Sequence, residues 1–250
     1  MQVFEAVRIL ILTTIAFVVA LGVTPICYRF LKKYSFSKQL RGREGTPIFH
    51  ELHQKKEGTP TSGGIIIWST ILGLAGVFWF LSYVFDGDWD YFNFVDRAQT
   101  YLPLATLAVA AILGLADDWF GILRIGGASG GGLKIRHKLL LYTVIAAVGA
   151  WWFFYKLEWD ILFVPFFGNV VVGAWYMPIF MFIIISSAFS ANETDGLDGL
   201  FGGVALFAFV ALTTVAFALG RYDLAAFGGI TIGALLAFLW FNIYPAKFFM

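Results

Sequence analysis

Seven long apolar stretches constrain the fold of this chain more than any other feature. Hydrophobic residues make up 60% of its 250 residues, whereas a soluble domain is only about half apolar. A helix that crosses a bilayer needs roughly 20 mostly apolar residues. We therefore predict an all-α integral membrane protein, a single polytopic domain over residues 1–250, with about seven transmembrane helices. The stretches run approximately over 5–30, 63–85, 99–116, 139–155, 173–190, 200–219 and 223–243.

The positions of the basic residues predict how these helices are oriented. Orientation follows the Lys and Arg content of the loops, and the cytoplasmic loops carry the excess. If the N-terminus lies outside, the inner loops and the tail hold 13 of the 17 basic residues. Eight of these lie between Arg29 and Lys56, four between Arg124 and Lys138, and one is Lys247. We therefore predict that the N-terminus lies outside.

The connection between the fourth and fifth stretches predicts a small β-structure. Two short β-prone runs flank Gly168-Asn169 within residues 163–172. Such runs on either side of a glycine-containing pair are typical of a β-hairpin. We expect this hairpin, with its turn at Gly168-Asn169, on the outer surface.

Unusual polar residues gather at the predicted inner ends of the stretches. Carboxylates next to hydrocarbon are costly and by default mark a functional pathway. Asp117 and Asp118 end the third stretch, where neighbouring side chains of a helix point about 100° apart. One is thus placed to hold a metal while the other polarises a nucleophile. If residues 194–200 begin the sixth helix, Asp195 and Asp198 lie on one face of it. The whole group comprises Lys56, Thr61, Asp117, Asp118, Lys138, Asn192, Asp195 and Asp198.

Each member of this group also has an ordinary structural explanation. Asp195 alone is typical of a helix N-cap, and Lys56 and Lys138 are typical of basic residues that flank inner helix ends. Together, however, hard oxygen ligands without a His or Cys cluster suit Mg²⁺ bound with substrate phosphates. Acidic ligands with basic partners favour phosphoryl transfer at the membrane surface. The alternative from another class is ion or proton translocation, which uses carboxylates near mid-span.

Four motifs carry a family resemblance. They are GTPTSGG after Lys56-Glu57, GLADD ending at Asp118, NETDGLDGL at 192–200 and FNIYPAKFFM at 241–250. In order and spacing they resemble the phospho-N-acetylmuramoyl-pentapeptide transferases (MraY, translocase I) of peptidoglycan synthesis. The resemblance implies transfer of phospho-MurNAc-pentapeptide from its UDP-linked precursor to undecaprenyl phosphate, giving lipid I and UMP, with Mg²⁺. It further implies a ten-helix fold and a homodimer in the bacterial inner membrane, with the site on the cytoplasmic face. No nucleic-acid partner is expected.

The same resemblance implies roles for individual residues. Asp117 is similar to the family's aspartate that deprotonates or orients the lipid phosphate, and Asp118 to its neighbour at the metal centre. Asn192 is implied as a further metal ligand. The positions that match the nucleotide and pyrophosphate cleft are Lys56, Thr61, Lys138, Asn192, Asp195, Asp198 and Asn242.

Two departures from the family pattern leave alternatives open. Gly121 stands where the family usually has a lysine, so a phosphate or uridine contact is missing or moved to Arg124. The sequence stops at Met250, where the family continues with a Gly-Asp that supplies a magnesium ligand and then three more helices. This predicts a truncated sequence, and an inactive fragment is one alternative. Another is a polyprenyl-phosphate N-acetylhexosamine-1-phosphate transferase, although GTPTSGG and Thr194 favour the muramoyl branch.

Overall fold

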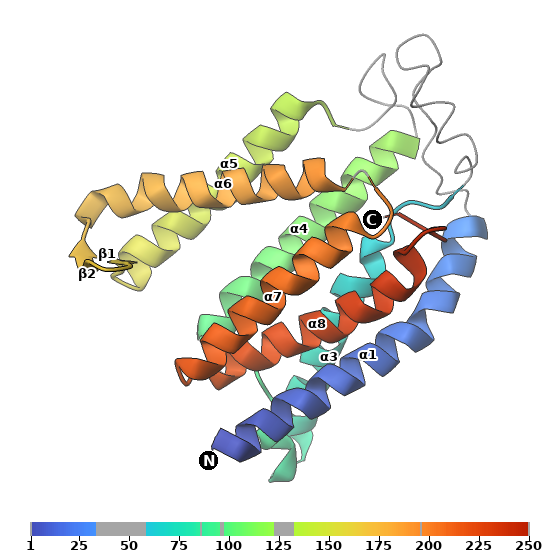
Figure 1. Cartoon of the computed structure of the whole chain (residues 1–250), viewed down its shortest axis with the longest axis horizontal. Coiled ribbons are helices and arrows are strands. Elements are labelled where there is room, and N and C mark those ends of the chain that lie inside the picture. Colours follow the sequence, from blue (N-terminus) through green and yellow to red (C-terminus); the bar gives the residue numbers. More distant parts are fainter. Residues whose placement is uncertain are drawn as a thin grey trace. The chain divides into compact units, whose positions relative to one another are not determined.

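The protein is an all-α membrane protein (Figure 1). The computed structural model describes residues 2–33, 59–85, 87–95, 98–122, 133–195 and 197–249. Within these ranges, seven helices are long and apolar enough to cross a membrane, which confirms the predicted fold class. The chain divides into two compact units, unit 1 (Met1–Gly132 and Leu197–Met250) and unit 2 (Leu133–Gly196). Lys56 lies outside the described residues.

Unit 1 is built around its last helix, α8, which has most of its spanning segment buried. Helices α1 and α7 pack along α8 (Figure 1). Small residues on α8 permit this: a Cβ added at Gly233 would lie 2.3 Å from the Thr13 carbonyl oxygen of α1. Close helix approach at small residues is typical of membrane bundles. The helices are α1 (Gln2–Lys33), α3 (Gly64–Val84), α4 (Ala98–Ile122), α7 (Leu200–Ala218) and α8 (Tyr222–Asn242), with a short 3-10 turn η2 (Asp88–Phe92).

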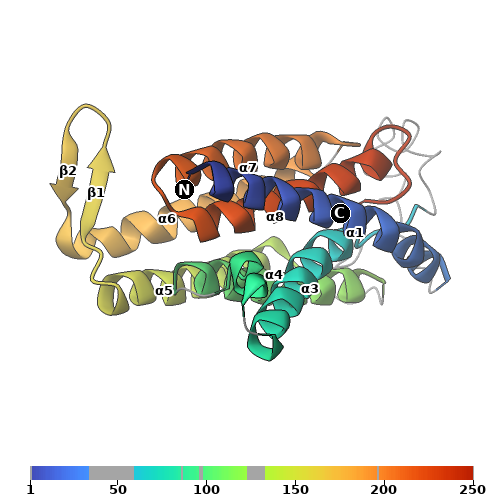
Figure 2. The ribbon, with the colours of Figure 1, turned by 90° about the horizontal axis from the view of Figure 1, so that it is seen from below.

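Unit 2 is a pair of helices joined by a hairpin (Figure 2). Helix α5 (Ile135–Trp151) continues into a π-helical turn η3 (Trp152–Lys156), and α6 (Tyr176–Thr194) follows a 3-10 turn η4 (Gly173–Trp175). Strands β1 (Ile161–Val164) and β2 (Gly168–Val171) lie between them and pair antiparallel. The predicted hairpin is therefore confirmed, whereas its place on the outer surface stays a prediction.

The turn of this hairpin differs from the prediction. Val164 pairs with Gly168, so residues 165–167 form the turn and Gly168-Asn169 belongs to β2. Pro165 suits the start of the turn because its φ is fixed. Gly168 takes a positive φ of 77° as the pairing begins, a conformation that favours glycine.

One predicted helix end is wrong and one condition considered for the aspartates is not met, and both matter for the site. Helix α4 runs to Ile122, so Asp117 and Asp118 lie inside its C-terminal part rather than at its end, because the apolar residues after the pair continue the helix. Helix α6 ends at Thr194 and α7 begins at Leu200. Asp195 and Asp198 therefore lie in the connection and do not share a helical face.

The connection before α7 also excludes the capping role considered for Asp195. The N-cap residue of α7 is Gly199, with a left-handed φ of 75° and no side-chain capping hydrogen bond. A left-handed residue cannot belong to the helix, so α7 starts directly after Gly199. Asp195 instead follows the last turn of α6 as its C-cap residue.

Candidate functional site

The aspartate pair of α4 is tied to the segment that precedes α3. The Ser62 hydroxyl donates a hydrogen bond of 2.5 Å to Oδ2 of Asp118. Ser62 and Thr61 are both buried, whereas Asp117 and Asp118 are partly exposed. Ser62 also has a positive φ of 68°, which is uncommon for a residue other than glycine and occurs mainly where the surroundings impose it. The GTPTSGG and GLADD motifs therefore meet through a defined contact.

The connection before α7 is tied to the end of the chain by two side chains. The amide of Asn242 uses both of its ends: Oδ1 accepts from the Gly199 N–H at 2.9 Å, and Nδ2 donates to the Phe248 carbonyl at 2.9 Å. Oδ2 of Asp198 accepts from the Ala246 N–H at 3.3 Å. Asn242 is buried, and a buried amide is stabilised when its donor and acceptor are both satisfied. These contacts fix the segment after α8 against the start of α7.

The same terminal segment pairs with the residues before α3. The Phe249 N–H donates to the Pro60 carbonyl at 2.9 Å, and the Gly63 N–H donates to the Phe249 carbonyl at 2.7 Å. The Phe248 ring is fully buried and packs against Phe238. A Cβ at Gly63 would lie 2.6 Å from the Phe248 ring and 2.7 Å from the Phe249 carbonyl oxygen. Only glycine fits there without displacing the backbone.

These contacts join segments of all four motifs at one end of unit 1. The contacts run from Asp118 through the segment before α3 to Phe249. From the terminal segment they continue through Asn242 to Gly199 and from Ala246 to Asp198. Asp118 accepts one bond from a hydroxyl and Asp198 accepts one from a backbone N–H. Such bonds help to hold a carboxylate in place.

Unit 2 contributes a second, smaller polar group. The Lys138 ammonium, on the first turn of α5, donates to Oδ1 of Asn192 at 3.3 Å. Asn192 lies in the last turn of α6, and Asp195 follows directly after that helix. Two residues that the sequence assigns to one site therefore lie in contact, at the end of unit 2 away from the hairpin.

Comparison with known proteins gives the family. The model of glycosyl transferase family 4 matches residues 100–250. The chain belongs to glycosyl transferase family 4. It is 34% identical over 98% of its length to the phospho-N-acetylmuramoyl-pentapeptide-transferase of Chloroflexus aurantiacus and covers 64% of that protein. It is 33% identical over 97% of its length to the enzyme of the same name in Anoxybacillus flavithermus, of which it covers 69%.

The family match extends over both units, from α4 to the end of α8 and the terminal segment. The Thr61–Ser62 segment lies before this region but within the part aligned with the two relatives. The catalytic and ligand-binding roles of Asp117, Asp118, Lys138, Asn192 and the other predicted residues stay predictions. So does the meeting of the residues of unit 1 with those of unit 2.

Sequence reasoning missed several residues that shape this site. Ser62, Gly63 and Phe248 each belong to a motif that the sequence singled out, but only Thr61 and Asn242 in those motifs were assigned roles. A signal existed for Gly63, because consecutive glycines at a helix start indicate close backbone approach. No comparable signal marked Phe248, whose partners come from α8 and from the segment before α3.

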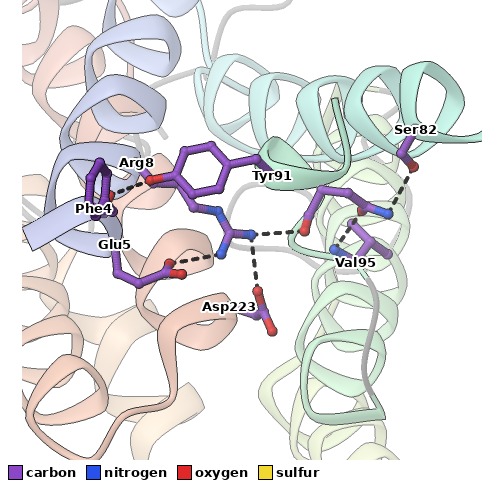
Figure 3. Close-up of polar contacts among 8 residues, drawn as sticks. Phe4, Glu5, Arg8, Ser82, Tyr91, Val95 and Asp223 are labelled. Carbon is purple, nitrogen blue, oxygen red and sulfur yellow. Dashed lines mark hydrogen bonds and ion pairs between the residues drawn. The ribbon is translucent and has the colours of Figure 1, made fainter. Parts of the chain in front are cut away.

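A second polar cluster, also missed, lies at the opposite end of unit 1 (Figure 3). The buried Arg8 of α1 donates to Oε2 of Glu5 at 3.1 Å and to Oδ1 of Asp223 at 3.0 Å. It also donates to the Asn93 carbonyl at 2.8 Å and lies 5.6 Å from the centre of the Tyr91 ring. The Tyr91 hydroxyl in turn donates to the Phe4 carbonyl. This Arg8 cluster links α1, η2 and α8.

Proposed function

We propose that the protein transfers phospho-MurNAc-pentapeptide from its UDP-linked precursor to undecaprenyl phosphate, giving lipid I and UMP. The proposed place is the cytoplasmic face of the bacterial inner membrane. The names of relatives at 33–34% identity support this substrate class. The observation in the structure that carries the proposal is the Ser62–Asp118 hydrogen bond. It fixes one carboxylate of the aspartate pair against a second motif of the chain.

The reaction makes one bond to phosphorus and breaks another. An oxygen of undecaprenyl phosphate attacks the phosphorus that carries the sugar. The bond from that phosphorus to the bridging oxygen of the pyrophosphate breaks, and UMP leaves with the electron pair. Such transfers rely on positioning and on neutralisation of negative charge. In this proposal Asp117 orients the attacking phosphate or accepts its proton, and the ammonium of Lys138 pairs with a substrate phosphate.

The donor set fits Mg²⁺. This ion prefers oxygen ligands, keeps several waters and is commonly held by one or two carboxylates together with substrate phosphates. In the ranges that the structure describes, no three His, Cys, Asp or Glu side chains gather into a metal-binding group. The adjacent carboxylates of Asp117 and Asp118 suit an ion that needs few protein ligands, and the resemblance adds Asn192. When bound, Mg²⁺ would offset charge on the pyrophosphate.

Reconstituted protein offers a direct test. UMP release and lipid I formation are measured in vesicles with undecaprenyl phosphate, UDP-MurNAc-pentapeptide and Mg²⁺. The chain is assayed as it stands and joined to the part of the Anoxybacillus relative that it does not cover, because it spans 69% of that protein. We expect transfer by at least one form. We also expect Asp117→Asn to abolish it and Asp90→Asn, an exposed acid on η2, to leave it unchanged.

Three outcomes would contradict the proposal. UMP release with UDP-N-acetylglucosamine but not with the muramoyl precursor would assign the protein to the hexosamine-phosphate transferases. Ion flux in the vesicles without any UMP release would favour translocation. Transfer that survives Asp117→Asn at the wild-type rate would remove that residue from the mechanism.

A further inference from the structure

The hairpin of unit 2 carries an exposed apolar surface. In an antiparallel pair, directly opposed residues point to the same face of the sheet, and Ile161 lies opposite Val171. Phe163 lies on that face with 70% of its surface exposed, and the turn residues Phe166 and Phe167 are 105% and 82% exposed. We call this surface the hairpin face. Its apolar members are Ile161, Phe163, Phe166, Phe167 and Val171, and the exposed Asn169, opposite Phe163, lies on the same face.

The hairpin and the residues that follow it, up to Asn192, lack charge. No Lys, Arg, Asp or Glu occurs from Ile161 to Asn192. Strands that expose an edge to water usually carry charged residues, which prevent association with other chains. An isolated two-stranded hairpin is also at best marginally stable in water. A neutral hairpin with three exposed phenylalanines is therefore poorly suited to an aqueous loop and well suited to an apolar boundary.

The direction of the strands indicates where this apolar boundary lies. Figure 2 shows β1 and β2 running across the ends of α5 and α6 rather than continuing along the helix axes. Both helices are long and apolar enough to cross a membrane, so the hairpin lies along the membrane surface at the level where they end. Open strand edges are not tolerated in the hydrocarbon core. The interface provides water and headgroups for the backbone edges and apolar chains for the phenylalanines.

Amphipathic aromatic residues mark the same level. Trp and Tyr concentrate where the headgroups of a bilayer lie, and five exposed ones flank the hairpin in unit 2. They are Trp151, Trp152, Tyr155, Trp159 and Trp175. The hairpin face is thus continuous along the chain with an aromatic belt at the ends of α5 and α6.

We propose that the hairpin face binds lipid, with the hairpin lying in the headgroup region and Phe166 and Phe167 inserted toward the acyl chains. The hairpin then anchors the connection between α5 and α6 to the membrane surface. This inference is independent of the transferase activity, because it rests on the hairpin alone.

Spin labels measure the environment of this face. The chain has one cysteine, Cys27, so Cys27→Ser gives a background in which single cysteines are introduced. Labels at Phe166→Cys and Phe163→Cys are compared with a label at Arg221→Cys, an exposed position in the turn between α7 and α8. Two spans separate the hairpin from that turn, so both lie on the same side of the membrane. The protein is placed in vesicles of phosphatidylglycerol and phosphatidylcholine in equal parts.

Collisions of the labels with oxygen, which concentrates in lipid, are compared with collisions with a water-soluble nickel chelate. We expect the oxygen-to-nickel ratio at positions 163 and 166 to exceed that at position 221 several-fold. Adding Phe167→Asp should lower the ratio at position 166, since a carboxylate draws the tip toward water. A ratio at 166 equal to that at 221 would overturn the proposal by placing the hairpin in water. Low collision with both reagents would overturn it in favour of a second copy or another protein covering the face.

Discussion

The two ends of unit 1 both gather polar side chains, but they hold them in different ways. In the Arg8 cluster, a buried guanidinium lies between the carboxylates of Glu5 and Asp223. At the end where the motifs meet, the carboxylates of Asp118 and Asp198 accept hydrogen bonds from a hydroxyl and from a backbone N–H. Opposite charges offset each other at the first end. At the second end, these two bonds tie each acid to a segment of another motif.

Because of this difference, we expect a structural role for one end of unit 1 and a chemical role for the other. An ion cluster whose charges satisfy one another is suited to joining α1, η2 and α8, and it has little capacity to bind a further ion. The bonds of Asp118 and Asp198 instead join segments that carry the four motifs. We therefore expect the Arg8 cluster to serve folding, and we propose that the aspartates of the motifs serve the reaction.

The largest expected effect on stability is that of Arg8→Met. It leaves two acids without their cation, and breaking a mostly buried ion pair from one side costs about 3 kcal/mol of unfolding free energy. Arg221→Met, which changes an exposed arginine at the start of α8, should change it by less than about 0.5 kcal/mol. Unfolding in mixed detergent micelles measures both. Equal losses would show that the cluster has no special role.

The next largest loss of stability is expected for Gly63→Ala, at the end of unit 1 where the motifs meet. Gly63→Ala forces a methyl group against the Phe248 ring and the Phe249 carbonyl, and such overpacking costs about 2 kcal/mol. Gly73→Ala, inside the helix α3 that follows Gly63, meets no atom within 4 Å and should be neutral or stabilising by up to about 1 kcal/mol. Thermal unfolding of the two variants distinguishes them. If both behave alike, the terminal segment does not pack against the start of α3 as described.

A smaller loss is expected for Asn242→Leu. It removes the partners of the Gly199 N–H and the Phe248 carbonyl, and leaving buried backbone groups unpaired costs about 1.5 kcal/mol. Asn169→Leu, on the exposed β2 strand, serves as the control and should have little effect. A stable Asn242→Leu protein with weakened substrate binding would instead favour the ligand-binding role that the sequence predicts.

The smallest effect is that of Glu5→Gln. Asp223 still offsets the charge of Arg8 in this variant, and a partly exposed ion pair contributes only about 0.5–1 kcal/mol. High salt should reduce the difference from the wild type because it screens exposed charges. Unfolding at low and at high salt provides the measurement. A loss of stability as large as that of Arg8→Met would mean that Asp223 does not offset the charge of Arg8 once Glu5 is neutral.

The spans were predictable from the sequence because length and hydropathy determine them. The seven spanning helices in the described part of the chain all overlap the predicted stretches. The ends were less predictable: α4 continues past its aspartates through Trp119 and Phe120, since an acidic pair does not stop a helix whose following residues are apolar. The hairpin was foreseen from its β-prone runs, but the turn is set by Pro165 and by the register of pairing, which a search for glycine pairs does not find.

The sequence singled out the motifs whose segments meet in unit 1, but it did not predict the contacts between them, and the gathering of all the predicted residues at one site stays a prediction. Asp118 meets Ser62 across 56 positions of the chain, and Arg8 meets Asp223 across 215. Local pattern does not encode such distant pairs. An arginine inside an apolar stretch was the one available signal for the Arg8 cluster, because a charge there requires a partner. For Asn242, the buried hydrogen bonds to the backbone became visible only in the folded chain.

The comparison of the two ends is tested most directly by Asp118→Asn and Asp223→Asn, made in the protein form that shows transfer. Both change one carboxylate to an amide of the same shape, and both UMP release and thermal unfolding are measured. We expect Asp118→Asn to lower the transfer rate about 100-fold or more, as loss of a charged catalytic group does, with little change in stability. We expect Asp223→Asn to destabilise the protein and keep the transfer rate of the folded fraction. The reverse pattern, with transfer lost in Asp223→Asn and kept in Asp118→Asn, would contradict this assignment.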